Sequence, residues 1–218
     1  MITDVVIIGG GNPNEWPSLS DYQKETTAWI GVDRGTLYGL KANLPLIKAV
    51  GDFDSLSKEE WIWVNEKLVD IESCQAEKDD TDMELGVLTA MEMFPEANII
   101  IIGGSGARLD HYLSNLWLPL QERFFPILEK ITLLDNLNSV SYFKPGNHQV
   151  KKERDKKYLA YICLTPVTNL TLYDAKYKLE NVDFTYPRSL SSNEFVGETS
   201  EFSFDSGLMC VIQTKDRE

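Results

Sequence analysis

The sequence is poor in cysteine and histidine, and it lacks long apolar runs. The three cysteines, Cys74, Cys163 and Cys210, are far apart and form no C-x-x-C pair, so we expect neither a disulfide framework nor a structural zinc site. With only two histidines in the chain, a catalytic zinc site or a Ser-His-Asp triad has little to build from. No apolar run approaches the roughly 20 residues that span a bilayer. The opening Met1–Asp4 has no basic region before its apolar stretch, so it does not predict a signal peptide, and we expect a cytoplasmic protein.

Positive charge is also scarce. The chain has 21 Lys and Arg residues against 34 Asp and Glu residues, which gives a net charge of −13. This balance argues against nucleic acid or an anionic membrane surface as a partner, because both require a basic patch. An acidic protein can still bind a polyphosphate, but we then expect a metal cation to mediate the contact.

The first part of the chain alternates short β-branched runs with longer amphipathic stretches. The runs 5–8, 28–32, 47–50 and 99–102 each stop at Gly or Asp, as buried parallel strands do. Capping-box spacing at Ser57 and Glu60 and at Thr81 and Glu84 predicts two helix starts, and a further helix is expected over 108–124. Residues 1–136 are therefore expected to form an open, parallel-sheet α/β domain of the Rossmann-like kind.

After about residue 136 the pattern changes. The segments 139–143, 158–164, 169–173, 194–204 and 208–213 are short, rich in β-branched and aromatic residues, and separated by turn residues. The stretch Asp135–Asn138 is the expected boundary. Residues 137–218 are predicted to form a smaller all-β domain of antiparallel strands, a β-sandwich.

Carboxylates gather where the predicted parallel strands end. The second and third runs lead into Asp33 and into Asp52 and Asp54, and Lys78-Asp79-Asp80-Thr81-Asp82 immediately precedes a helix. Ligands of open α/β sheets bind beyond the carboxyl ends of the strands, so several of these carboxylates should converge on one cleft. Mg²⁺ prefers oxygen ligands and often completes its shell with substrate phosphates, so the cluster predicts a magnesium site.

Each of these features also has a simpler explanation. Asp-x-Asp is a common pattern, an Asp or Ser after a strand often only caps the next helix, and glycines at 103, 104 and 106 suit any tight turn. The loop lacks the Gly-Lys-Ser/Thr ending of a Walker A motif, and Gly9–Gly11 does not keep the G-x-G-x-x-G spacing. An Arg in a glycine-rich turn, such as Arg108, either clamps a phosphate or pairs with a nearby Asp. The prediction depends on several such strand ends occurring within one sheet.

Read together, these segments resemble the thiamine pyrophosphokinase family over essentially the full length of the chain. The matching segments are 32–35, 51–55, 77–82 and 103–111, with 175–179 and 191–195 in the C-terminal part. The resemblance implies an N-terminal catalytic domain, a C-terminal β-sandwich that binds thiamine, and a homodimer with its active sites between subunits.

The resemblance also implies a role for individual residues. Asp52, Asp54 and Asp82, with Asp79 nearby, would hold Mg²⁺ on the phosphates of ATP, and Asp33, Asp80 and Asp110 match catalytic positions. Nucleotide binding is expected at Lys78, Thr81, Gly103, Gly104, Ser105, Gly106 and Arg108. Ser192 and Asn193 would contact thiamine, and Tyr177 would stack on it, from the partner subunit. Asp80 and Asp110 are equal candidates for the carboxylate that accepts or orients the hydroxyl proton of thiamine.

The activity implied is Mg²⁺-dependent transfer of a diphosphoryl group from ATP to thiamine, which gives thiamine diphosphate and AMP. An acidic cleft with an aromatic wall suits the thiazolium cation of thiamine. Two alternatives stay open: a Mg²⁺-dependent phosphohydrolase or nucleotidyltransferase that uses the same aspartates, and a non-catalytic nucleotide or thiamine sensor.

Overall fold

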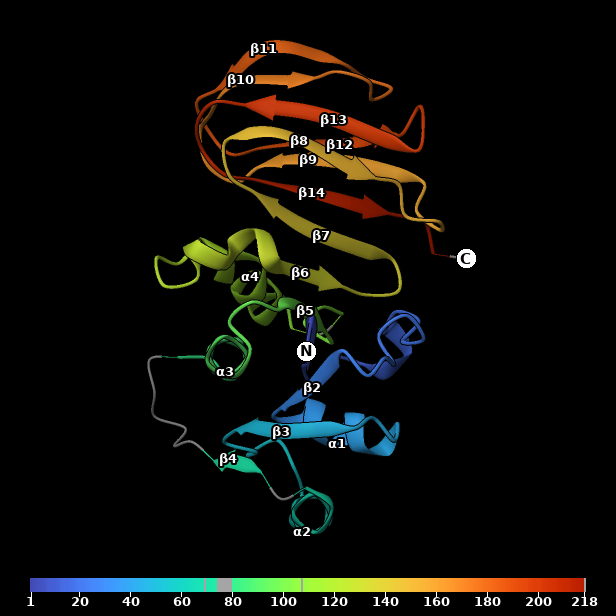
Figure 1. Ribbon diagram of the computed structural model, residues 1–218, viewed down its shortest axis with the longest axis vertical. Coiled ribbons are helices and arrows are strands. Elements are labelled where there is room, and N and C mark those ends of the chain that lie inside the picture. The colour runs from blue at the N-terminus through green and yellow to red at the C-terminus, as the bar shows by residue number, and fades with distance from the viewer. Residues whose placement is uncertain (69, 74–79, 107, 218) are drawn as a thin grey trace. The chain divides into compact units, whose positions relative to one another are not determined.

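The computed structural model describes residues 1–68, 70–73, 80–106 and 108–217 (Figure 1). The chain divides into two compact units, Met1–Phe124 with Leu133–Asn136, and Phe125–Thr132 with Leu137–Glu218. The division falls within strand β6 (Ile131–Leu134). Within the described ranges, no helix has both the length and the apolar character needed to cross a membrane.

The first unit contains a parallel sheet. Its strands are β1 (Asp4–Ile8), β2 (Thr27–Val32), β3 (Leu46–Gly51), β4 (Ile71–Ser73) and β5 (Asn98–Ile102). They lie in the order β5-β1-β2-β3-β4, and neighbouring strands pair in parallel. β2 is buried along its whole length, and β1 and β5 are buried except at their first residues, which explains their nearly unbroken apolar sequences. The prediction of α/β structure with a parallel sheet is confirmed. The three-residue strand β4 was not anticipated.

The helices of this unit follow local sequence signals. α2 (Lys58–Lys67) and α3 (Asp82–Met93) begin at Ser57 and Thr81, and each has the complete capping box that the spacing predicted. The helix expected over 108–124 is shorter: α4 (Leu109–Trp117) gives way to a 3₁₀ turn, η2 (Leu118–Leu120), because Pro119 has no N–H to continue the α-helical bonding. α1 (Arg34–Lys41) and the 3₁₀ turn η1 (Pro13–Glu15) were not predicted.

Two of these helices cover opposite faces of the sheet. A Cβ atom placed on Gly39 of α1 would lie 3.0 Å from Ile8 Cδ1, whereas one on Gly86 of α3 would lie 3.3 Å from Ile7 Cγ2. Ile7 and Ile8 are consecutive in β1 and therefore point to opposite faces. The first unit is thus a three-layer α/β arrangement, and α1 and α3 can be followed on the two sides of the sheet in Figure 1.

The strand order reverses at β1, which has β2 on one side and β5 on the other. The loops that leave β1 and β5 at this point are joined by hydrogen bonds from Gly9 N to Ile102 O and from Gly11 N to Gly103 O, both 2.8 Å. Such a reversal opens a crevice beyond the carboxyl ends of the strands. The fold therefore places a ligand site beside the two glycine-rich loops.

The second unit is all-β apart from the 3₁₀ segment η3 (Phe125–Lys130). One antiparallel sheet has the order β12-β9-β14-β7 and the other the order β11-β10-β13-β8. Their bounds are β7 (Asn138–Phe143), β8 (Gly146–Lys151), β9 (Tyr158–Cys163), β10 (Val167–Leu172), β11 (Leu179–Phe184), β12 (Arg188–Glu194), β13 (Thr199–Phe204) and β14 (Met209–Thr214).

Side chains from both sheets share one core. Tyr161 of β9 and Met209 of β14 pack in the same buried cluster as Leu170 of β10 and Phe202 of β13. A sandwich-like all-β part is therefore confirmed. The expectation of a single strand over 194–204 was wrong, because β12 ends at Glu194 and β13 begins at Thr199. Strands β8 and β11 and most of β12 were not anticipated.

Candidate active site

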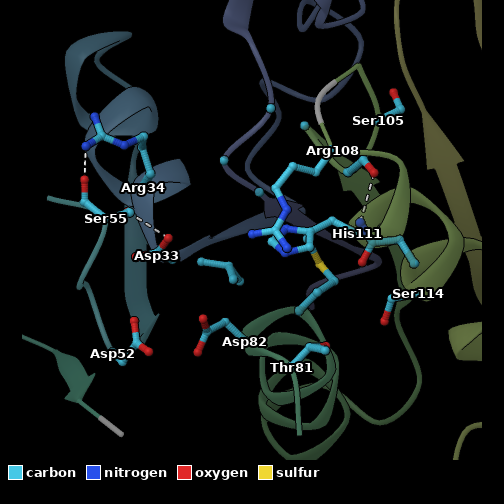
Figure 2. Close-up of a pocket in the computed structure, with 18 of the residues that line it drawn as sticks. Asp33, Arg34, Asp52, Ser55, Thr81, Asp82, Ser105, Arg108, His111 and Ser114 are labelled. Atoms are coloured by element: carbon cyan, nitrogen blue, oxygen red, sulfur yellow. Dashed lines mark hydrogen bonds between the residues drawn. The ribbon is translucent and has the colours of Figure 1, made fainter. Parts of the chain in front are cut away.

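A pocket of about 450 Å³ lies beyond the carboxyl ends of the parallel strands in the first unit. Its volume is in the range of small-molecule sites. Figure 2 shows side chains entering it from the ends of β2 and β3, from the start of α3 and from the glycine-rich loop and α4. The lining comes from segments 9–11, 32–34, 52–55, 80–83 and 103–115.

Three aspartates meet beside this pocket, and two of them, Asp33 and Asp52, line it. Asp33 follows β2, whereas Asp52 and Asp54 follow β3, and each offers a carboxylate oxygen within 4.8 Å of the other two. The negative charge of Asp52 raises the pKa of Asp54, and slight desolvation and the charge of Asp33 add to the effect. The sequence prediction that these carboxylates converge is therefore met for three of them.

The oxygen donors of this cluster fit a hard divalent cation. Asp33 Oδ2 accepts a 2.7 Å hydrogen bond from the Ser55 hydroxyl, but the buried Oδ1 has no hydrogen-bond partner among the described residues. A buried carboxylate oxygen without a donor is costly. A cation bound by Asp33, Asp52 and Asp54 would satisfy it and would remove the repulsion that raises the pKa of Asp54.

The start of α3 forms another wall. Asp80, Thr81 and Asp82 line the same pocket, and Figure 2 shows the Asp82 and Asp52 carboxylates on the same side of it. Thr81 is the N-cap of α3: its hydroxyl accepts from Glu84 N, and its own N–H donates to Glu84 Oε2 at 2.7 Å. Thr81 therefore caps α3, as its capping-box spacing with Glu84 predicted. Lys78 and Asp79, also expected at the site, lie outside the described residues.

The glycine-rich loop after β5 forms the opposite side. Gly103, Gly104 and Ser105 line the pocket, and Gly103 and Gly106 have φ values of +64° and +77°. A Cβ on Gly103 would lie 2.5 Å from Gly9 O, so only glycine allows the two loops to approach so closely.

Arg108 and His111 line the pocket, and Asp110 is held beside Arg108. Arg108 Nε and Nη2 donate to Asp110 Oδ1 and Oδ2 at 3.1 and 2.5 Å. These bonds, with a smaller contribution from His111 N–H, lower the pKa of Asp110 to about 2. The same contact raises the pKa of Arg108. In this state Arg108 pairs with a nearby Asp, one of the two explanations that its sequence position left open.

The three residues expected to contact thiamine belong to the second unit. Tyr177 is exposed, at 59%. Asn193 is 3% exposed: its side chain accepts from Tyr177 N and donates to Tyr177 O, both at 2.9 Å. Ser192 is exposed, with φ +61°, where the pairing of β12 with β9 shifts register. The Asn193 amide is thus already used to hold the Tyr177 backbone.

Asn115 and Asp135 also build the site, although the sequence did not predict a role for them. Asn115 Nδ2 donates to Gly104 O at 2.8 Å, and Asp135 Oδ2 accepts from the Ser105 hydroxyl at 2.6 Å, so Asn115 and Asp135 both brace the glycine-rich loop. Asn115 lies one helical turn after His111, a spacing that could have identified it. Asp135 follows β6 as the other aspartates follow their strands, although its sequence position predicts only a domain boundary.

Comparison with known proteins agrees with this geometry. Residues 19–127 match the family model described as the thiamin pyrophosphokinase catalytic domain, and residues 147–209 match the thiamin pyrophosphokinase vitamin B1 binding domain. The thiamine pyrophosphokinase of Bacillus subtilis is 36% identical over 212 residues, covering 96% of this chain and 98% of the relative.

Solved structures give the same result. A thiamin pyrophosphokinase family protein from Enterococcus faecalis has a TM-score of 0.93 at 49% identity, with all of both chains covered. The thiamin pyrophosphokinase of Geobacillus thermodenitrificans has a TM-score of 0.85 at 31% identity, covering 100% of this chain and 99% of the other. The two domain matches and these full-length similarities lead to one conclusion: the chain belongs to the thiamine pyrophosphokinase family.

Proposed function

We propose that this protein transfers the diphosphoryl group of ATP to the hydroxyl of thiamine, giving thiamine diphosphate and AMP, and that it requires Mg²⁺. The observation that supports the metal and nucleotide most directly is the Asp33, Asp52 and Asp54 cluster, of which Asp33 and Asp52 line one pocket with Asp82 and two glycine-rich loops. Carboxylates suit the cation, and backbone N–H groups of a glycine-rich loop suit phosphate oxygens.

In this proposal the protein acts mainly by positioning. Phosphoryl chemistry leaves little covalent work for side chains, so alignment and charge neutralisation dominate. Asp52, Asp54 and Asp82, with Asp79, would hold Mg²⁺, which when bound neutralises charge on the transferring phosphates. Gly103, Gly104, Ser105, Gly106, Lys78 and Thr81 would contact the nucleotide. Arg108 would leave Asp110 and pair with a phosphate when the nucleotide binds. Both side chains are exposed at the start of α4, so Arg108 can change its partner there.

Asp80 is the better candidate for orienting the hydroxyl of thiamine. Asp80 and Asp110 are both ion-paired, with Arg123 and Arg108, but it is Asp80 that lines the pocket. Asp33, which meets Asp52 and Asp54 in one cluster, would be both a catalytic carboxylate and a further ligand of the cation.

Thiamine would be contacted by Ser192 and Asn193 and stacked on by Tyr177, with Tyr177 coming from the partner subunit of a homodimer. The roles of the two parts of the chain are assigned from the two family models, described as catalytic over residues 19–127 and as vitamin B1 binding over residues 147–209. We accordingly assign catalysis to residues 1–136 and thiamine binding and dimer formation to 137–218. Light scattering during gel filtration tests the dimer: a monomeric mass under assay conditions would contradict it.

The deciding experiment is incubation with ATP, Mg²⁺ and thiamine, followed by chromatography of both products. We expect thiamine diphosphate and AMP in equal amounts, and neither product when thiamine or Mg²⁺ is omitted. Release of ADP and phosphate without thiamine would favour the phosphohydrolase alternative. Stabilisation by ligands without any product would favour a sensor.

A further inference from the structure

The acidic start of α3 is held by an arginine that comes from another part of the chain. Arg123 Nη2 lies 2.7 Å from Asp80 Oδ1 and 3.5 Å from Glu84 Oε1. Asp80 lines the pocket, and Glu84 closes the capping box of α3 through Oε2. One guanidinium therefore bridges the residue before the N-cap and the third residue of the helix. Thr81 and Asp82 lie between these two anchors, so the contact also restrains them.

Arg123 is itself held in place. Its Nε donates to Gln121 Oε1 at 3.0 Å, and the Gln121 amide donates to Glu84 Oε1. Its guanidinium carbon lies 4.7 Å from the centroid of the Phe124 ring, a fully buried side chain. A planar guanidinium that stacks on an aromatic ring and pairs with two carboxylates is far more constrained than an ordinary surface ion pair.

The burial of the three partners shows what the arrangement supports. The side chain of Glu84 is 8% exposed, that of Asp80 is 29% exposed and that of Arg123 is 35% exposed. Glu84 is thus the fixed, buried end of the cluster and Asp80 the end that faces the pocket. Arg123 is not among the described residues that line that pocket, so it acts on the pocket through Asp80.

We propose that Arg123 is a positioning residue: through its ion pair with Asp80 it holds the acidic start of α3 in the pocket, and so keeps Asp82 in place for the divalent cation. The inference rests on the proposed function for its link to catalysis. Its structural content concerns Asp80 and cation binding alone, which can be measured without turnover.

The test is the affinity of the nucleotide-free protein for Mn²⁺, measured by electron paramagnetic resonance. We expect Arg123→Ala to weaken Mn²⁺ binding about 10-fold, the scale at which groups that orient metal ligands act. Arg123→Lys should recover part of this loss, because a lysine can pair with Asp80 but cannot reproduce the planar fork. Arg154→Ala, which removes an exposed arginine from the turn between β8 and β9, is the matched control and should bind as the unaltered protein does.

A double-mutant cycle separates this role from general stability. If Arg123 acts through Asp80, the Arg123→Ala, Asp80→Asn double variant should bind Mn²⁺ no more weakly than the worse single variant. Losses that multiply, or an Arg123→Ala protein that is folded and binds Mn²⁺ normally, would overturn the proposal. If Arg123→Ala does not fold, Arg123→Lys and Gln121→Ala provide the comparison, and normal Mn²⁺ binding by both would equally overturn it.

Steady-state kinetics add a second readout. Arg123→Ala should lower kcat while the KM for thiamine changes little, because the residues assigned to holding thiamine, Tyr177, Ser192 and Asn193, lie in the other unit and Asp80 is assigned only to its reacting hydroxyl. If the unaltered protein forms no thiamine diphosphate, the proposed function is contradicted. The role of Arg123 still stands in that case, provided that the variants bind Mn²⁺ as expected.

Discussion

The Ser55 hydroxyl donates a 2.7 Å hydrogen bond to Asp33 Oδ2 and so joins the loop after β3 to the end of β2. This bond fixes the Asp33 carboxylate and leaves its buried Oδ1 without a hydrogen-bond partner among the described residues. We predict that Ser55→Ala weakens Mn²⁺ binding about 10-fold, because a ligand loses the group that orients it. Isothermal titration of the nucleotide-free protein measures this, with Ser20→Ala, which removes an exposed hydroxyl, as the control. Equal affinity in Ser55→Ala and Ser20→Ala would disprove the orienting role.

The cation assignment makes a stronger prediction for the carboxylates themselves. Asp54→Ala and Asp82→Ala should fold normally and lose at least roughly 100-fold in kcat, the scale of one lost electrostatic stabiliser. Product formation at saturating substrates measures the loss, and circular dichroism checks the fold. Asp205→Ala, which changes a carboxylate of the second unit, should keep its activity. Near-normal turnover in both pocket variants would refute the assignment.

The Arg108–Asp110 pair predicts a titration. Arg108 holds the pKa of Asp110 at about 2, below its reference value of 3.8. In Arg108→Ala the pKa of Asp110 should rise toward 3.8, which carbon NMR of the carboxyl group can follow. Because the folded-state pKa is the lower one, the stabilisation from this pair is fully present above pH about 4 and is lost as pH falls toward 2. An unchanged Asp110 titration in Arg108→Ala would show that the ion pair does not form in solution.

Asn193 supports Tyr177 through its backbone, so the two residues should give different results. Tyr177→Ala should mainly raise the KM for thiamine and leave stability nearly unchanged, because the ring is exposed. Asn193→Ala should raise the same KM and also lower the free energy of unfolding by about 1–3 kcal/mol, since it leaves backbone groups of Tyr177 and Glu194 without their partner. Urea unfolding with Asn147→Ala as an exposed control measures the difference. A change confined to the KM for ATP would show that Tyr177 is misplaced.

Two adjacent glycines of the loop after β5 provide a matched comparison. Gly103→Ala should destabilise the protein by about 1–2 kcal/mol from its positive φ alone, and further because the new Cβ would lie 2.5 Å from the backbone oxygen of Gly9. Gly104→Ala meets Ile101 Cγ2 at 3.1 Å and has no positive φ, so its loss should be smaller. Urea unfolding of the two variants tests the order, and a reversed order would contradict the described contact between the loops.

The elements that the sequence predicted are those with strong local signals. The β1 and β5 runs are apolar almost throughout because both faces are covered, and the capping boxes at Ser57 and Thr81 are complete within four residues. β12 was largely missed because most of its residues are exposed, so its sequence has neither an apolar run nor a clear alternation. α1 was missed because Gly35 and Gly39 lower its helix propensity.

The site was predictable to the extent that strand ends identify it. Asp33, Asp52 and Asp54 could be brought together from the sequence because parallel strands end at one edge of a sheet. The contact of Arg123 with Asp80 could not be predicted in this way, because the two residues are 43 positions apart and no local pattern links them. Asp135 accepts a hydrogen bond from Ser105 of the glycine-rich loop, 30 residues earlier, and such a contact depends on tertiary packing.

All the described residues that line the pocket belong to the first unit, yet they come from five separate segments between residues 9 and 115. The pocket therefore cannot be transferred to another protein as one short peptide segment, because any single segment would supply only one wall of it. For the same reason, an insertion or deletion that shifts a single strand of the parallel sheet would displace one wall of this cleft relative to the others, so indels within these strands should be less tolerated during divergence than substitutions.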